Sequence, residues 1–81
     1  MNKKIFTILE NGVKISYDVI LTFKSEKTHK NYVVYTDNSL DEDDKLKIYA
    51  AIYNPDTFEF IAGVDTDEEW IEINKLLEKV L

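Results

Sequence analysis

The sequence predicts an α+β protein, in which a strongly curled, five-stranded antiparallel meander carries one C-terminal α-helix packed on one face. Apolar and polar residues alternate from Val13 to Phe23, which is the period of a half-buried strand. The run from Asp65 to Trp70 has the composition of a helix start. We expect a single domain over residues 1–81, with strands at about 5–9, 13–24, 32–36, 46–53 and 58–61 and a helix at about 67–80.

The first two strands are predicted to form a hairpin around Asn11-Gly12, because both residues tolerate the positive φ angles of a type I′ turn. Counting outward from this turn pairs Ile8 with Ile15 and Phe6 with Tyr17. The turn chemistry and the hydrophobic pattern therefore predict the same register.

The alternation in the second strand has one exception, Ile20, which is apolar at a position expected to be polar. If the alternation simply continues past it, Val19, Leu21 and Phe23 lie on the same face as the apolar residues of the first hairpin.

A polar stretch from Ser25 to Asn31 suits a second hairpin. If its turn centres on Thr28 and His29, Phe23 opposes Val34. Neither turn residue favours a positive φ as glycine would.

Acidic residues occupy five of the eight positions from Asp37 to Asp44, and we expect a solvated loop there. The strand at 46–53 has two largely apolar faces, so it is expected to be central in the sheet or covered on both sides. The run Asn54–Thr57 has the composition of a type I turn, with proline at the favoured second position. Residues 58–61 then return as the fifth strand.

The helix is predicted to begin with Thr66 as its N-cap and Glu69 closing a capping box. Asp67 and Glu68 place negative charge at the positive end of the helix dipole. Apolar residues at helical spacing form a stripe expected to cover the sheet, namely Trp70, Ile73, Leu77 and Val80 or Leu81, widened by Ile71 and Leu76.

The composition limits the classes of function. The chain has no cysteine, which excludes disulfides, thiolate zinc sites and thiol nucleophiles. Its 16 acidic residues against 10 lysines give a net charge of −6, which disfavours phosphate polymers and anionic lipid surfaces as partners. The first apolar segment is too short for a signal peptide or a membrane span, so we expect a cytoplasmic protein without membrane contact.

The acidic loop is the natural candidate for a cation site, because hard cations prefer carboxylate oxygens. Its spacing does not match an EF-hand, however. Counted from Asp37, the sixth position is not glycine, and the twelfth is Ile48 where a glutamate is needed. A solvated loop that protects a neighbouring sheet edge is favoured, and we expect no metal and no cofactor.

Candidate catalytic groups are few. His29 is the only histidine, and it lies among lysines in the second turn, where exposed solubilising charge explains it. The serines, Ser16, Ser25 and Ser39, have no neighbouring base and acid that would make a nucleophile. We therefore expect no enzymatic activity. Direct nucleic-acid binding is also disfavoured, because the lysine cluster is short and the chain has no arginine.

Tyrosines offer a candidate interaction surface. Tyr35, Tyr49 and Tyr53 are expected to share the sheet face opposite the main core, where an exposed aromatic patch is typical of protein recognition. The alternative is that these residues bury their rings in the sheet and expose only their hydroxyl groups. The sequence leaves both interpretations open.

The order of several short motifs resembles the YrzB-like family of small acidic bacterial proteins, which is labelled a domain of unknown function. The motifs are Phe23-Lys24-Ser25-Glu26, the run Lys30–Thr36, the acidic loop, Ile48-Tyr49-Ala50 and Asp67-Glu68-Glu69-Trp70. Members of that family usually carry glycine in the turn near His29. The resemblance implies a bacterial cytoplasmic protein and supplies no catalytic or binding residues.

Two functional hypotheses follow. The first is a non-enzymatic protein-interaction module with an unknown protein partner, monomeric or weakly dimeric, acting through the tyrosine surface or an exposed edge strand. The second is an acidic inhibitor or mimic that binds the basic groove of a nucleic-acid-handling protein through the clusters Asp37–Asp44 and Asp65–Glu69.

Overall fold

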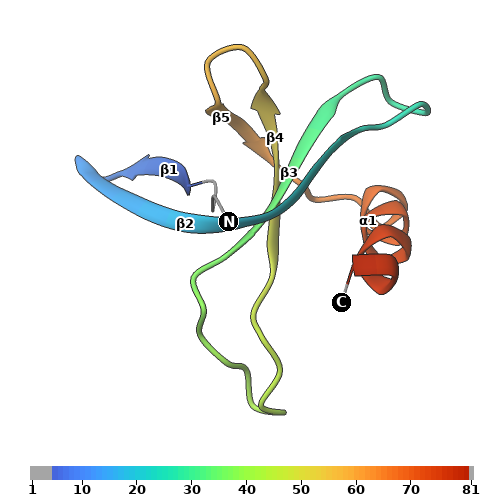
Figure 1. Cartoon of the computed structure of the whole chain (residues 1–81). Coiled ribbons are helices and arrows are strands. Elements are labelled where there is room, and N and C mark those ends of the chain that lie inside the picture. Colours follow the sequence, from blue (N-terminus) through green and yellow to red (C-terminus); the bar gives the residue numbers. More distant parts are fainter. Residues whose placement is uncertain (1–4, 81) are drawn as a thin grey trace.

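Five strands form one antiparallel sheet in the order β1-β2-β3-β4-β5, and a helix follows them. The computed structural model describes residues 5–80. The elements are β1 (Ile5–Glu10), β2 (Val13–Lys24), β3 (Asn31–Thr36), β4 (Tyr49–Asn54), β5 (Glu59–Gly63) and α1 (Asp67–Val80). The sheet curls until its two edge strands, β1 and β5, approach each other, so that it is nearly a barrel (Figure 1). The predicted fold class is confirmed.

The hairpin of β1 and β2 has the predicted turn and register. Asn11 and Gly12 both have positive φ, 51° and 79°, as a type I′ turn requires. Ile8 lies opposite Ile15, and Phe6 lies opposite Tyr17.

A β-bulge at Ile20 divides β2 into two parts. The register with β3 shifts between Val19 and Leu21, because Ile20 is an extra residue on this strand. Val19 therefore packs with the residues inside the curl, whereas Leu21 and Phe23 pack on the opposite face. The prediction that these three residues share one face is wrong, since one inserted residue exchanges the two faces of a strand.

The turn between β2 and β3 is closed by Ser25, whose carbonyl accepts the backbone N–H of His29 at 2.9 Å. The Ser25 hydroxyl also accepts the N–H groups of Lys27 and Thr28 at 3.2 and 3.3 Å. His29 adopts a φ of 60° to finish the turn. Because the turn spans residues 26–29, Phe23 opposes Tyr32. The predicted pairing of Phe23 with Val34 is wrong.

The turn between β4 and β5 repeats this geometry. The Asn54 carbonyl accepts the Phe58 N–H at 2.7 Å, the Asn54 side chain accepts the Asp56 N–H at 2.9 Å, and Phe58 has a φ of 61°. The fifth strand thus begins at Glu59, whereas the composition places its start at Phe58. The Phe58 ring turns inward against Phe6, with ring centroids 5.5 Å apart.

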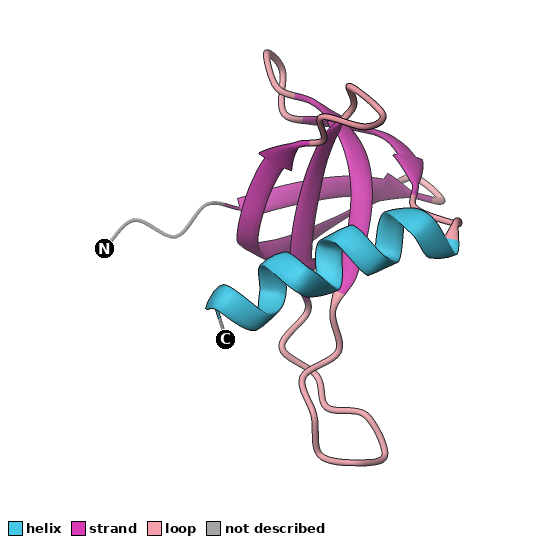
Figure 2. Cartoon of the chain, turned by 90° about the vertical axis from the view of Figure 1, so that its right-hand side faces the viewer, coloured by secondary structure: helices cyan, strands magenta, loops and turns pink. Residues whose placement is uncertain are grey.

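Strand β3 separates two hydrophobic clusters and is buried on both faces. The cluster inside the curl consists of Phe6, Ile8, Val33, Tyr35, Ala51 and Tyr53. The cluster on the outer face consists of Val34, Ala50, Ile73 and Leu77, with Leu21, Phe23 and Trp70 packed against it. Helix α1 covers this outer face, crossing the strands as Figure 2 shows.

The start of α1 matches the prediction in most respects. The Glu69 N–H donates to the Thr66 hydroxyl at 3.3 Å, so Thr66 is the N-cap. The Glu69 carboxylate accepts the Thr66 hydroxyl proton at 2.6 Å, so the reciprocal contact of the capping box runs between side chains.

Ile71 and Val80, expected in the buried stripe, are 55% and 57% exposed. Leu81 lies outside the described residues.

The connection from β3 to β4 forms an arm that projects from the curled sheet (Figures 1 and 2). Leu40 and Leu46 pair in an isolated bridge, and Asp41 accepts backbone N–H groups from Asp43 and Lys45 near the tip. Strand β4 therefore begins at Tyr49, although the sequence pattern places its start at residue 46.

Candidate binding groove

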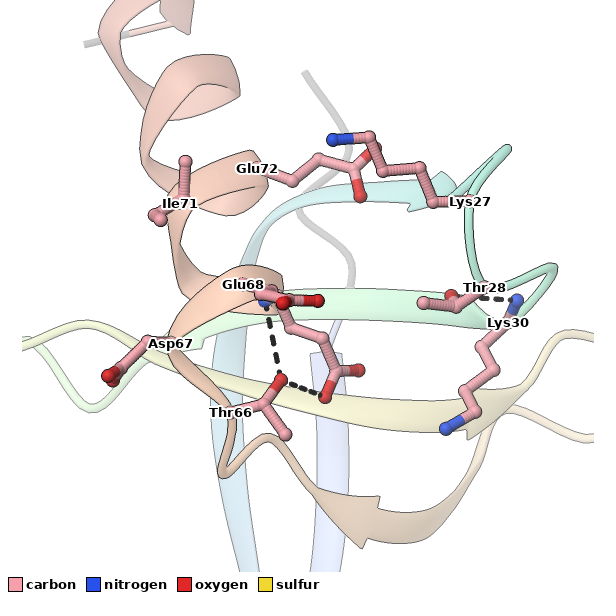
Figure 3. A pocket seen from close by; sticks show the side chains of 9 residues that line it. Lys27, Thr28, Lys30, Thr66, Asp67, Glu68, Ile71 and Glu72 are labelled. Atoms are coloured by element: carbon pink, nitrogen blue, oxygen red, sulfur yellow. Dashed lines mark hydrogen bonds between the residues drawn. The ribbon is translucent and has the colours of Figure 1, made fainter.

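A groove of about 680 Å³ lies between the β2–β3 turn and the first two turns of α1 (Figure 3). Its lining comes from two segments far apart in the sequence. The residues are Lys27, Thr28 and Lys30 from the turn and Thr66, Asp67, Glu68, Glu69, Ile71 and Glu72 from the helix start.

Hydrogen bonds between buried hydroxyl groups and helix carboxylates join the two walls. The Ser25 hydroxyl donates to Glu72 at 2.8 Å, and the Tyr32 hydroxyl donates to Glu69. Ser25 is fully buried and Tyr32 is almost fully buried. A charge-assisted bond to a carboxylate is stronger than one between neutral groups. These contacts hold the helix start at a fixed position against the turn.

The protonation of the groove follows from the same contacts. The Thr66 hydroxyl, the Tyr32 hydroxyl and the nearby Lys30 charge together hold the pKa of Glu69 below its usual value. Burial, and after it the bond to Glu69, raise the pKa of Tyr32. Glu69 is therefore ionised and Tyr32 neutral near pH 7.

The outer parts of the walls carry opposite charges. Lys27 and Lys30 lie exposed on the turn, and Asp67 and Glu68 lie exposed on the helix. Ile71 is 55% exposed on the helix wall (Figure 3). The groove thus has a basic wall from the turn and a helix wall that carries acidic side chains and one exposed apolar side chain.

The structure does not assemble the candidate catalytic residues around this groove. His29 is exposed in the β2–β3 turn, and Ser25 is committed to hydrogen bonds with Glu72 and the turn backbone. Among residues 5–80, no group of three or more acidic or histidine side chains is arranged to hold a metal ion.

The three candidate tyrosines share one sheet face, but it is the inside of the curl, where Phe6 and Ile8 also pack, so the prediction that they lie opposite this core is wrong. Tyr35 and Tyr53 are buried there, 7% and 9% exposed, whereas Tyr49 is 37% exposed near the open end. The Tyr35 and Tyr49 rings stack with centroids 5.7 Å apart, and Tyr53 meets Phe6 edge to face. Of the three, Tyr49 is the most exposed.

Sequence reasoning missed the groove, although part of it was visible. A helix turns by about 100° per residue, so Ile71 stands well away from the stripe of Trp70, Ile73 and Leu77. An apolar residue on the solvent-exposed side of a helix indicates a point of contact with another molecule. The groove also needs the β2–β3 turn, whose position depends on the register of the second hairpin, which the pattern predicted wrongly.

The fold and groove describe a small α+β protein with a curled meander, one covering helix and a groove at the start of that helix. Residues 10–81 match the family described as protein of unknown function (DUF1292), and the chain belongs to this family. Among the residues that the structure describes, no helix has the length and apolar character needed to cross a membrane.

Similar curated proteins all carry an uncharacterised-family name. A UPF0473 protein of Leuconostoc mesenteroides is 31% identical over 98% of this chain and 85% of the relative. One from Listeria monocytogenes serotype 4b is 36% identical over 89% of the chain and 75% of the relative. UPF0473 protein YrzB of Bacillus subtilis is 29% identical over 98% of the chain and 88% of the relative. The resemblance found in the sequence is thus confirmed. No solved structure matches the chain.

Proposed function

We propose that the protein is a non-enzymatic protein-interaction module of the bacterial cytoplasm, and that it binds a short extended segment of a partner protein in the groove beside α1. The observation that carries this proposal is a groove with a basic wall and an acidic wall, whose helix side also carries the exposed Ile71.

The groove chemistry defines the segment that would fit. An apolar side chain of the partner would pack on Ile71, and burying that contact supplies affinity. An acidic side chain of the segment would face Lys27 and Lys30, and a basic one would face Asp67 and Glu68. Opposite charges across an interface select the partner and its orientation more than they add affinity.

The rigidity of the walls supports a binding role. Ser25 and Tyr32 fasten the helix to the turn through Glu72 and Glu69, so the groove exists before a ligand arrives. A preformed site loses less conformational entropy on binding. The groove is small compared with a stable protein interface, and we therefore expect a transient complex.

To test this proposal, a partner protein is recovered from the native host and purified, and its binding affinity is measured. We expect Ile71→Ser, and separately Lys27→Glu with Lys30→Glu, to weaken binding at least tenfold. Ile61→Ser is the matched control, because Ile61 is a 60% exposed isoleucine on β5, outside the groove. Thermal unfolding confirms that each variant is folded. Unchanged affinity in both groove variants would assign the contact to another surface.

The second candidate function, an acidic inhibitor or mimic of nucleic acid, is supported by the projecting arm. Four consecutive acidic residues, Asp41–Asp44, lie exposed at the tip of this arm. Such a contact would depend on charge, so its affinity would fall steeply with added salt. Replacing the four acids by amides should weaken it, while Ile71→Ser should not change it.

A further inference from the structure

We propose that the open rim of the curled sheet, where Tyr17, Tyr35 and Tyr49 meet Asp37, is a separate contact site that receives a lysine or arginine side chain of a partner protein. This site lies at the opposite end of β3 from the groove, since Tyr35 is near the end of the strand and Tyr32 is near its start.

The aromatic part of the rim is three tyrosine rings in mutual contact. The centroids are 4.9 Å apart for Tyr17 and Tyr35, 5.7 Å for Tyr35 and Tyr49, and 6.3 Å for Tyr17 and Tyr49. Tyr35 is buried, Tyr17 is half-buried and Tyr49 is 37% exposed. The buried ring thus supports two rings that reach solvent.

The rim also carries fixed negative charge. The Asp37 carboxylate accepts the Tyr49 hydroxyl proton at 3.5 Å, and it accepts the hydroxyl and backbone N–H of Ser39 at 2.6 and 3.0 Å. The bonds from Ser39 hold the pKa of Asp37 below its usual value, so this carboxylate is ionised near neutral pH. Burial is the largest cause that raises the pKa of Tyr17, and the charges of Glu10 and Asp37 are the next largest.

These groups together suit a cation. The face of a tyrosine ring is negative and attracts ammonium and guanidinium groups within about 6 Å of its centroid. A carboxylate beside the ring adds direct charge attraction. Lys47, on the same connection as Asp37, is near enough to contribute to lowering the pKa of that carboxylate. An incoming cation would therefore compete with Lys47.

The test uses an acetylated, amidated peptide with one arginine, titrated into the ¹⁵N-labelled protein, and the same peptide with glutamine as the control probe. We expect arginine-dependent shifts at Tyr17, Asp37 and Tyr49. We expect Tyr49→Leu and Asp37→Asn to weaken binding at least fivefold, Tyr49→Phe to retain it and Lys47→Gln to strengthen it.

Two controls separate this site from other surfaces. Ile71→Ser alters the groove and should leave arginine binding unchanged, so the rim and the proposed function can fail independently. Phe60→Leu changes a 41% exposed ring on β5 and should also have no effect. Shifts confined to Asp41–Asp44 or to Asp67 and Glu68, or binding unaffected by Tyr49→Leu, would show attraction to other acidic residues and overturn the proposal.

Discussion

Trp70 anchors the start of the helix to the sheet. Its ring packs against the cluster beneath α1, and its indole N–H donates to the Val64 carbonyl at 3.3 Å. Replacing it by alanine removes apolar contacts and leaves a cavity, so we expect Trp70→Ala to lower the free energy of unfolding by about 3–5 kcal/mol. Urea denaturation followed by circular dichroism measures this loss.

The neighbouring residue provides the control for this prediction. Ile71 is on the same helix turn but is largely exposed, so Ile71→Ala should change stability by no more than about 0.5 kcal/mol. If the two variants had the same stability, the indole ring of Trp70 would not anchor the helix to the sheet.

The lowered pKa of Glu69 predicts that the protein loses stability in acid. Its pKa is lowered in the folded protein by Thr66, Tyr32 and Lys30, so the folded state binds its proton less readily than the unfolded state. This contribution is fully present above the ordinary glutamate pKa and is lost as the pH falls through the lowered value. Urea denaturation at pH 7 and pH 3 should therefore show a smaller acid loss for Glu69→Gln than for the wild type. An equal loss in both proteins would contradict this role.

The conformation of a single residue could be predicted from the sequence where the cause of that conformation is local. The turn at Asn11-Gly12 and the cap at Thr66 depend on the residues themselves and their immediate neighbours, and both are as expected. The exposure of Tyr35 and Tyr53 depends on which face of the sheet curls inward. That choice is made by the packing of all five strands.

At the scale of elements, β2 shows how one residue redirects a strand. Its first part faces the interior with Val19, and its second part faces the helix with Leu21. The bulge between them lets one long strand contribute to both clusters. Ile20 breaks the alternation of the sequence at this point, but an isolated break does not say whether a strand bulges or merely carries an exposed apolar residue.

The two turns that end with His29 and Phe58 share a conformation that favours glycine. His29 is exposed, so its φ of 60° is a cost that no buried contact offsets, unlike that of Phe58. We expect His29→Gly to raise the free energy of unfolding by about 0.5–1 kcal/mol. Thermal and urea denaturation measure the gain.

The matched control is Lys27→Gly in the same turn, where φ is not positive. This variant only adds flexibility to the unfolded chain and should lower stability by about 0.5–1 kcal/mol. If both glycine variants lost stability equally, the strain assigned to His29 would be absent.

At the scale of the whole molecule, the sheet is a partition between two small cores. An 81-residue chain can bury only roughly 60% of the surface its unfolded form exposes, so neither core is large. The strand order and the position of the helix followed from hydrophobic periodicity and turn chemistry. The groove could not be predicted in the same way, because it forms where the β2–β3 turn meets the helix start, more than thirty residues further along the chain.

The position of the sheet between the two cores predicts the order in which backbone amides exchange with solvent. Strand β3 is buried on both faces and hydrogen-bonded to β2 and β4, whereas all five residues of β5 are exposed. Amides of β3 should therefore exchange only through global unfolding, and those of β5 should exchange through local opening, at least tenfold faster. Hydrogen exchange read by NMR distinguishes the two. If β1 and β5 were protected as strongly as β3, the approach of the two edge strands would seal the sheet into a closed barrel, and neither edge would be available to a partner.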